Sequence, residues 1–461
     1  MAIQAAFVVP HPPLIVPEIG KGKERAIQKT IDAYRQVAGR IGELQPETIV
    51  VISSHQVMYA NYFHISPGGE ARGTFEKFQA GQIGFEASYD TEFVELLCAL
   101  AWEKRLPAGT EGETDKQLDH GTMVPLYFIG KCWTECRLVR IGMSGLSLMK
   151  HYELGQCIKE AADLLGRKAV VVASGDLSHK LRAEGPGGFR KEGPEYDSRM
   201  MYVLGNGNFG ELLDFPEELC NKAGECGHRA ITMMAGALDR TGVAARRLSY
   251  EGPFGIGYGV CEYLVRGEDA KRDFKERHEE KERERIRSQI EKQDAYVALA
   301  RKAVEEYVRT GRTLKAPSGL PKELYSRRAG AFVSINENGS LRGCIGTIQP
   351  GGESLAEEII QNAVSAASRD PRFPPVESEE LDRLTITVDV LGEVERISSP
   401  EELDVKRYGV IVSSGNSRGL LLPNLAGVDT VPEQIAIARR KAGIDEREEV
   451  QLERFEVERH F

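Results

Sequence analysis

The chain has 461 residues, too many for one ordinary domain core, so two or three domains are expected. Its composition, 41% hydrophobic and 28% charged, is typical of a soluble globular protein, and its formal net charge of -10 argues against a constitutive nucleic-acid or anionic-membrane binder. The sequence contains no apolar run of membrane-spanning length, no signal peptide and no zinc-ribbon spacing among its eight cysteines. We therefore expect a cytoplasmic protein with reduced thiols.

Short apolar runs alternate with helical patterns in the N-terminal part of the chain. The runs at residues 5–9, 48–52, 137–141 and 168–173 predict buried strands. The stretches 22–41, 91–101, 148–165 and 228–239 predict helices. Strands that alternate with helices favour an α/β domain with a central, mostly parallel sheet.

An almost entirely charged segment, residues 266–294, interrupts this pattern. Such a run cannot bury a core face, so it predicts an exposed helical linker. We therefore expect an N-terminal α/β domain over residues 1–265 and a smaller α+β domain over residues 295–461.

Three of the nine histidines follow directly after predicted strands: His11 in FVVPHPPL, His55 in TIVVISSHQ and His179 in VVVASGDLSHK. A fourth, His120, lies in the loop LDHGTMVPL. If the three strands are parallel neighbours, their carboxyl ends bring these imidazoles together, because ligands gather there in open α/β sheets. Convergent histidines fit either a metal site or acid–base chemistry. Two imidazoles and one carboxylate can bind Fe(II) with positions left open, yet the residues alone do not choose iron over zinc.

The motifs PHPPL, ISSH, DHGTMVPL and SGDLSH, in this order, resemble the catalytic subunit of class III extradiol dioxygenases, over residues 1–265. The resemblance implies Fe(II) held by His11, His55 and Glu225, and a small aromatic diol and dioxygen as substrates. It also implies that His179 transfers protons and that His120 orients the substrate or a ligand. Asp176 would fix the SGDLSH turn.

The third ligand has several candidates. Glu225 can instead be an exposed helix-entry residue favoured by the helix dipole. Glu251, in SYEGPFG, is the reserve carboxylate, and His228 would give a three-histidine site like that of the related Memo proteins. That reading describes a metal-binding interaction protein without dioxygenase activity. Cys226 is a soft ligand that would admit zinc or copper, but we expect it only to pack.

The second domain carries LRGCIGTI, SRDPRFPPV and GLLLPNLAG, which resemble the AMMECR family. The fusion resembles the AmmeMemoRadiSam system protein A family, which implies a radical SAM enzyme as partner, and extradiol-like domains imply a homodimer. Cys344 is interpreted either as a reactive thiol activated by Arg342, two residues before it, or as a small packed residue. Arg369, Asp370 and Arg372 would line a groove or form a salt-bridged loop.

Overall fold

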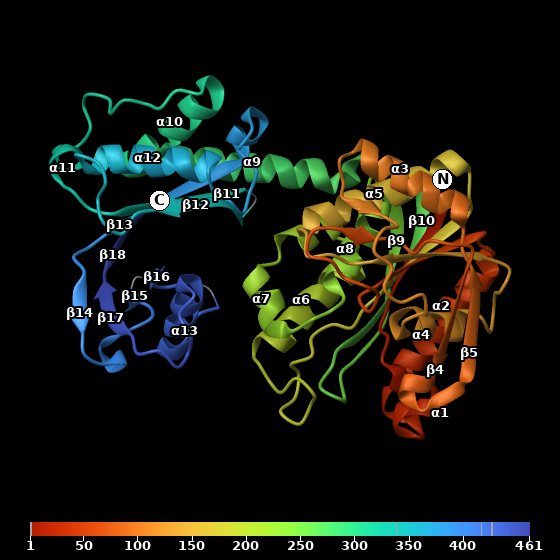
Figure 1. The fold of residues 1–461 in the computed structure, drawn as a ribbon. Coiled ribbons are helices and arrows are strands. Elements are labelled where there is room, and N and C mark those ends of the chain that lie inside the picture. The colour runs from red at the N-terminus through yellow and green to blue at the C-terminus, as the bar shows by residue number, and fades with distance from the viewer. Residues whose placement is uncertain (1, 338, 416, 426) are drawn as a thin grey trace. The chain divides into compact units, whose positions relative to one another are not determined.

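The computed structural model describes residues 2–337, 339–415, 417–425 and 427–461 (Figure 1). It divides into two compact units, Met1–His278 and Glu279–Phe461. Among the described residues, no helix combines the length and the apolar character needed to cross a membrane.

The first unit is built on a six-stranded sheet in the order β7-β2-β8-β1-β10-β9. Its strands are β1 (Ile3–Val9), β2 (Thr48–Ser53), β7 (Arg137–Gly142), β8 (Ala169–Ser174), β9 (Thr241–Glu251) and β10 (Tyr258–Glu268). The first four run parallel to one another, β10 runs antiparallel to β1, and β9 runs antiparallel to β10. The predicted α/β domain with a mostly parallel sheet is therefore confirmed.

Helices cover both faces of this sheet (Figure 1). Successive residues of β1 face opposite cores: Ala6 and Val8 pack with α3 (Thr91–Glu103), α5 (Leu148–Leu165), α6 (Glu192–Asn206) and α8 (His228–Ala237). Phe7 and Val9 pack with α2 (Gln28–Leu44) and α4 (His120–Ile129) on the other face. A strand buried on both faces is apolar without alternation, which is why the four parallel strands were visible in the sequence.

Smaller elements complete the first unit. The predicted helix 22–41 is divided, since a 3-10 segment over Lys23–Ile27 precedes α2. The other elements are α1 (Pro17–Gly20), β3 (Phe63–His64), β4 (Glu70–Phe75), β5 (Ala80–Ser88), β6 (Ala108–Gly109) and α7 (Glu217–Ala223). β4 and β5 form an antiparallel hairpin that the sequence patterns did not indicate.

The charged segment has more than one structure. Its first residues still belong to β10, which continues to Glu268, and its larger part forms α9 (Phe274–Lys292). The boundary between the two compact units falls within α9. All residues of α9 are described, and Ile286 is the single buried one among them.

The second unit contains two four-stranded antiparallel sheets and several helices, which confirms the α+β prediction. The first sheet has the order β12-β11-β13-β18, formed by β11 (Ala331–Glu337), β12 (Ser340–Gly346), β13 (Leu384–Leu391) and β18 (Val457–His460). The second has the order β14-β17-β15-β16, formed by β14 (Glu395–Ile397), β15 (Gly409–Ser414), β16 (Ser417–Leu421) and β17 (Gln451–Phe455). The helices are α10 (Ala295–Thr310), α11 (Lys322–Ser326), α12 (Leu355–Ser368) and α13 (Val431–Ala442).

Candidate metal centre

The carboxyl ends of β2, β8 and β1 meet at one edge of the first sheet, because these strands are parallel neighbours. His11 follows β1, His55 follows β2 and His120 is the first residue of α4. The ring centroid of His55 lies 4.6 Å from that of His11 and 3.8 Å from that of His120. The topology thus brings three of the four candidate histidines into one cluster.

His11 has a defined tautomer. Its ring is buried, and Nδ1 lies 3.1 Å from Ser174 Oγ. The Ser174 hydroxyl donates its own proton to the Gly121 carbonyl at 2.5 Å, so it accepts one from His11 Nδ1. The lone pair of the neutral ring then lies on Nε2, the nitrogen that faces His55. Burial, followed by the nearby His55, lowers the His11 pKa to about 3, which keeps this ring neutral.

Among the described residues, one group of histidine, cysteine and acidic side chains could hold a metal ion, namely His11, His55 and Cys226. The ligand atoms of these three residues all lie within 4.8 Å of one another. The two Nε2 atoms are 2.9 Å apart, and Cys226 Sγ lies 3.6 Å from His11 Nε2. Ligand atoms about 2.0–2.3 Å from one ion lie about 3–3.6 Å from each other. The donor set and its spacing therefore fit a divalent transition-metal ion, and we call these three residues the metal centre.

Glu225 lies outside this group. Its carboxylate Oε2 accepts a hydrogen bond from the His228 backbone N–H at 2.7 Å, at the start of α8. The first turn of a helix leaves backbone N–H groups without partners, and Glu225 satisfies one of them. The next residue, Cys226, has its thiol against His11 instead, and the Asp176 N–H donates to its Sγ at 3.3 Å. The structure therefore places Cys226, which we expected only to pack, against a candidate ligand.

The reserve candidates for the third ligand also have other partners. The Glu251 carboxylate accepts hydrogen bonds from the backbone N–H and the hydroxyl of Thr30, both at 2.8 Å. The buried His228 ring contacts the Leu212 carbonyl through Nε2 at 2.9 Å.

His179 lies close enough to the metal centre to interact electrostatically with His11 and His55. Its Nε2 is buried and has no hydrogen-bond partner among the described residues. Burial is the main cause that lowers the His179 pKa, while the Asp176 carboxylate opposes it. Asp176 is itself buried, accepts from the His11 backbone N–H at 2.9 Å, and has its pKa raised to about 6 by burial. It thus joins the turn after β8 to the end of β1.

A cleft of about 170 Å³ adjoins the metal centre, with His55 and His120 in its wall. Phe78, from the segment between β4 and β5, contributes an apolar face, and its ring centroid lies 5.3 Å from that of His120. Burial, followed by His55, lowers the His120 pKa to about 3, so this ring is neutral as well. The cleft therefore offers an aromatic surface next to the uncharged imidazole of His120.

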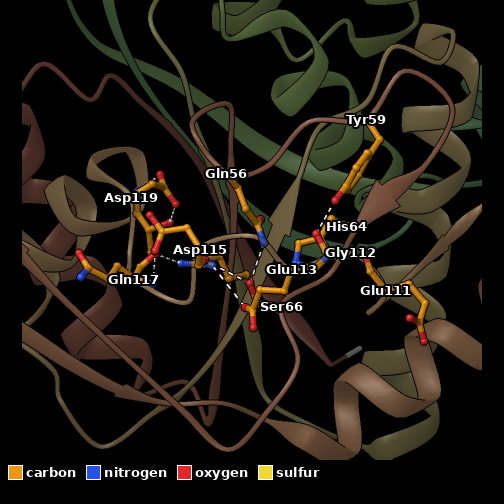
Figure 2. A network of polar contacts seen from close by, with 12 residues as sticks. Gln56, Tyr59, His64, Ser66, Glu111, Gly112, Glu113, Asp115, Gln117 and Asp119 are labelled. Carbon is orange, nitrogen blue, oxygen red and sulfur yellow. Dashed lines mark hydrogen bonds and ion pairs between the residues drawn. The ribbon is translucent and has the colours of Figure 1, made fainter.

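The polar side of the cleft is built around Arg140, which is buried in β7. Its guanidinium donates to Ser66 Oγ and to the Gln117 carbonyl, both at 2.7 Å. Gln56 also donates to Ser66 Oγ, at 2.6 Å, as the network in Figure 2 shows. Sequence reasoning missed these residues. The signal that could have found Arg140 is an arginine inside the otherwise apolar run RLVRIG.

The two candidates of the second domain are not partners of each other. The Arg342 guanidinium binds the Glu380 carboxylate through Nε at 2.7 Å and Nη2 at 3.0 Å, and its Nη1 donates to the Pro374 carbonyl at 2.8 Å. The thiol of Cys344 accepts instead from the Ser334 hydroxyl at 3.2 Å. Arg342 therefore fastens the loop before Glu380.

Comparisons with known proteins cover both units. A family model described as the catalytic LigB subunit of aromatic ring-opening dioxygenase matches residues 5–261, and the AMMECR1 family model matches residues 297–460. A protein of Clostridium acetobutylicum is 38% identical over 100% of this chain and 99% of its own length. A Thermotoga maritima protein is 52% identical over 36% of this chain and 96% of its own length.

Among solved structures, the crystal structure of an uncharacterized protein from Pyrococcus horikoshii is 38% identical. It covers 36% of this chain and 88% of that chain, with a TM-score of 0.33. The LigB model spans more than half of the chain, and the Clostridium relative matches it along its whole length. The chain therefore belongs to the family of the catalytic LigB subunit of aromatic ring-opening dioxygenases, with an AMMECR1 domain fused behind the LigB domain.

Proposed function

We propose that the N-terminal domain is a metal-dependent oxygenase that opens the ring of a small aromatic diol. The observation that carries the proposal is the group of His11, His55 and Cys226 at the carboxyl edge of the sheet of a LigB-family domain. Fe(II) is the proposed ion, with zinc and copper as alternatives, since imidazole and thiolate ligands suit all three. The bound ion would supply the Lewis acidity and the electron chemistry that diol and dioxygen require.

Two further histidines would handle protons in this reaction. His120 is neutral because of burial and lines the cleft, so its ring can orient a diol hydroxyl or accept a proton from it. His179 has a buried Nε2 without a partner in the described part of the chain, so the protein does not engage its lone pair or proton. The face of Phe78 would pack against the ring of the diol.

A second candidate function is metal binding without oxygenase activity, as in the Memo-like reading. It is favoured by one observation, the thiol of Cys226 where a facial triad has a carboxylate. A thiolate donates more charge to the ion than a carboxylate does and binds zinc and copper(I) tightly. Under this reading, the cleft would hold a ligand that is recognised but not oxidised.

The ligand set is tested with cobalt, whose thiolate complexes have a strong charge-transfer absorption. We expect this absorption in the Co(II)-loaded protein, its loss in Cys226→Ser, and its retention in Glu225→Gln, the matched neighbour. Absence of the band in the Co(II)-loaded protein, together with loss of cobalt binding in Glu225→Gln, would return the third position to the carboxylate.

The reaction is tested by oxygen uptake. Protein loaded anaerobically with Fe(II) is mixed with catechol and with ring-substituted catechols, and we expect one dioxygen consumed per ring-opened product. His179→Gln is expected to keep the metal and lose about 10²–10⁴-fold in rate, the usual worth of a proton-transfer residue. Tight metal binding without oxygen uptake from any diol would favour the second candidate. The expected radical SAM partner and the homodimer remain predictions.

A further inference from the structure

Two serines end neighbouring strands of the first sheet, directly beside the metal centre. Ser53 is the last residue of β2 and Ser174 is the last residue of β8, and the two are paired in the parallel register of these strands. Both residues are completely buried. A hydroxyl group that is removed from water must find its partners within the protein, so the contacts of these two serines show what they hold in place.

Ser174 joins the ring of His11 to the first turn of α4. Its hydroxyl accepts from His11 Nδ1 at 3.1 Å and donates to the Gly121 carbonyl at 2.5 Å. A ring whose Nδ1 proton is engaged in this way presents Nε2, the nitrogen that belongs to the metal centre, as a lone pair. The orientation of the His11 ring and the position of the first turn of α4 therefore depend on the same hydroxyl group.

Ser53 makes a similar connection from the second ligand, His55. Its hydroxyl accepts from the His55 backbone N–H at 3.2 Å and donates to Asp119 Oδ1 at 2.5 Å. Asp119 is the N-cap of α4, and the next residue is His120, whose ring lines the cleft. Ser53 therefore fixes the residue before His120, and Ser174 fixes the residue after it.

The first turn of α4 fits closely against these groups. A Cβ on Gly121 would lie 2.4 Å from Ser53 Oγ, 3.0 Å from Asp119 Oδ1 and 3.4 Å from His11 Nδ1. Groups from the ends of two strands therefore lie within contact distance of one backbone position. The turn cannot shift without moving at least one of them.

We propose that Ser53 and Ser174 are positioning residues that couple metal binding to the placement of His120. When His11 is held as a ligand, Ser174 transmits the position of its ring to the first turn of α4, and Ser53 does the same from the backbone of His55. The inference rests on the proposed function, in which the ligands and the cleft serve one reaction. If each serine only satisfied the polar groups next to it, the two would act independently of each other.

The coupling is tested by the affinity of the full-length protein for Zn(II), measured by competition with a chelator in Ser53→Ala, Ser174→Ala and the double variant. We expect each single substitution to weaken the affinity by about 10–100-fold, as is usual for residues that orient metal ligands. The double variant should lose clearly less than the product of the two single losses, because the first substitution already releases the turn that the second one acts on.

Ser249→Ala is the matched control. It also removes a buried hydroxyl from this sheet, in β9, but this hydroxyl has no partner among the described residues. Its Zn(II) affinity should equal that of the unsubstituted protein. Losses in the two serine variants that multiply exactly in the double variant, or an unchanged affinity in either of them, would overturn the proposal.

The ring signals of His120 provide a second readout, which does not depend on activity. In the Zn(II)-loaded, full-length protein labelled with ¹⁵N at histidine, we expect both Ser53→Ala and Ser174→Ala to shift the ring nitrogen signals of His120, while those of His460 stay in place. Unmoved His120 signals in both variants would contradict the coupling. Neither experiment measures oxygen uptake, so a protein that opens no diol but shows both effects would refute the proposed reaction and leave the coupling intact.

Discussion

At the metal centre, the buried His11 and the exposed His55 turn ring nitrogens toward each other, whereas the partly exposed thiol of Cys344 is surrounded by paired groups. The Nε2 atoms of His11 and His55 face each other at 2.9 Å, and the nearby His179 Nε2 has no partner within the described residues. Around Cys344, the Asp370 carboxylate is saturated by donors. The contrast teaches that ring nitrogens without protein partners indicate a cation in the first region, whereas the charged groups around Cys344 already satisfy one another.

The largest expected effect comes from His55→Ala. This removes one of three ligands, and two remaining ligands rarely hold an exchangeable divalent ion, so metal affinity should fall at least about 100-fold. Because His55 is exposed, the free energy of unfolding of the metal-free protein should change by less than about 0.5 kcal/mol. Metal analysis and chemical denaturation measure the two quantities. Unchanged metal content would show that His55 is not a ligand and would contradict the proposed metal centre.

Gly121→Ala tests whether the metal centre depends on close packing. A Cβ at this position would lie 2.4 Å from Ser53 Oγ and 3.4 Å from His11 Nδ1. The Ser53 side chain must therefore move, next to the imidazole of His11. We expect a loss of about 1–3 kcal/mol in the free energy of unfolding and a weaker affinity for metal. Gly39→Ala, where the added Cβ meets no atom within 4 Å, is the matched control. A stable variant with normal metal affinity would show that the centre tolerates movement.

Asp370→Asn tests whether the second region depends on charge pairing. The Arg372 guanidinium is the main cause that holds the pKa of the Asp370 carboxyl well below its usual range. Its stabilising contribution is therefore present above the unfolded-state pKa of about 4 and is lost as pH falls through the lower folded-state pKa. The substitution should cost about 1–3 kcal/mol at pH 7 and progressively less below pH 4. Asp382→Asn, an exposed position, should cost almost nothing at either pH. A loss independent of pH would argue against the charge pair.

The fold of the first unit could be predicted because its parallel strands are buried on both faces and therefore apolar throughout. The same patterns placed His11 and His55 at strand ends, and the order of the strands then determines that these residues meet. The third ligand could not be predicted this way. Glu225 and Cys226 are adjacent, and which of them faces the histidines depends on where α8 begins.

The cleft and the surroundings of Cys344 show a different limit of prediction from sequence. Phe78 comes from a hairpin region with no sequence signal for its position, and only packing brings it to His120. In β12, Arg342 and Cys344 are two residues apart, and residues two apart on an extended strand share a face. The long arginine side chain reaches Glu380 instead.

The charged composition of helix α9 determines which substitutions it tolerates. After its first turns, where Phe274 packs against the core of the first unit and Lys275 binds Glu153, its residues are constrained mainly by helix propensity and by the need to stay polar, with Ile286 as the single buried residue. Lys, Arg, Glu and Gln are nearly equivalent in such a setting, so exchanges among them should be close to neutral. Among relatives of this chain, we therefore expect residues 279–292 to diverge fastest in identity while they keep their composition, with apolar residues retained at positions 274 and 286.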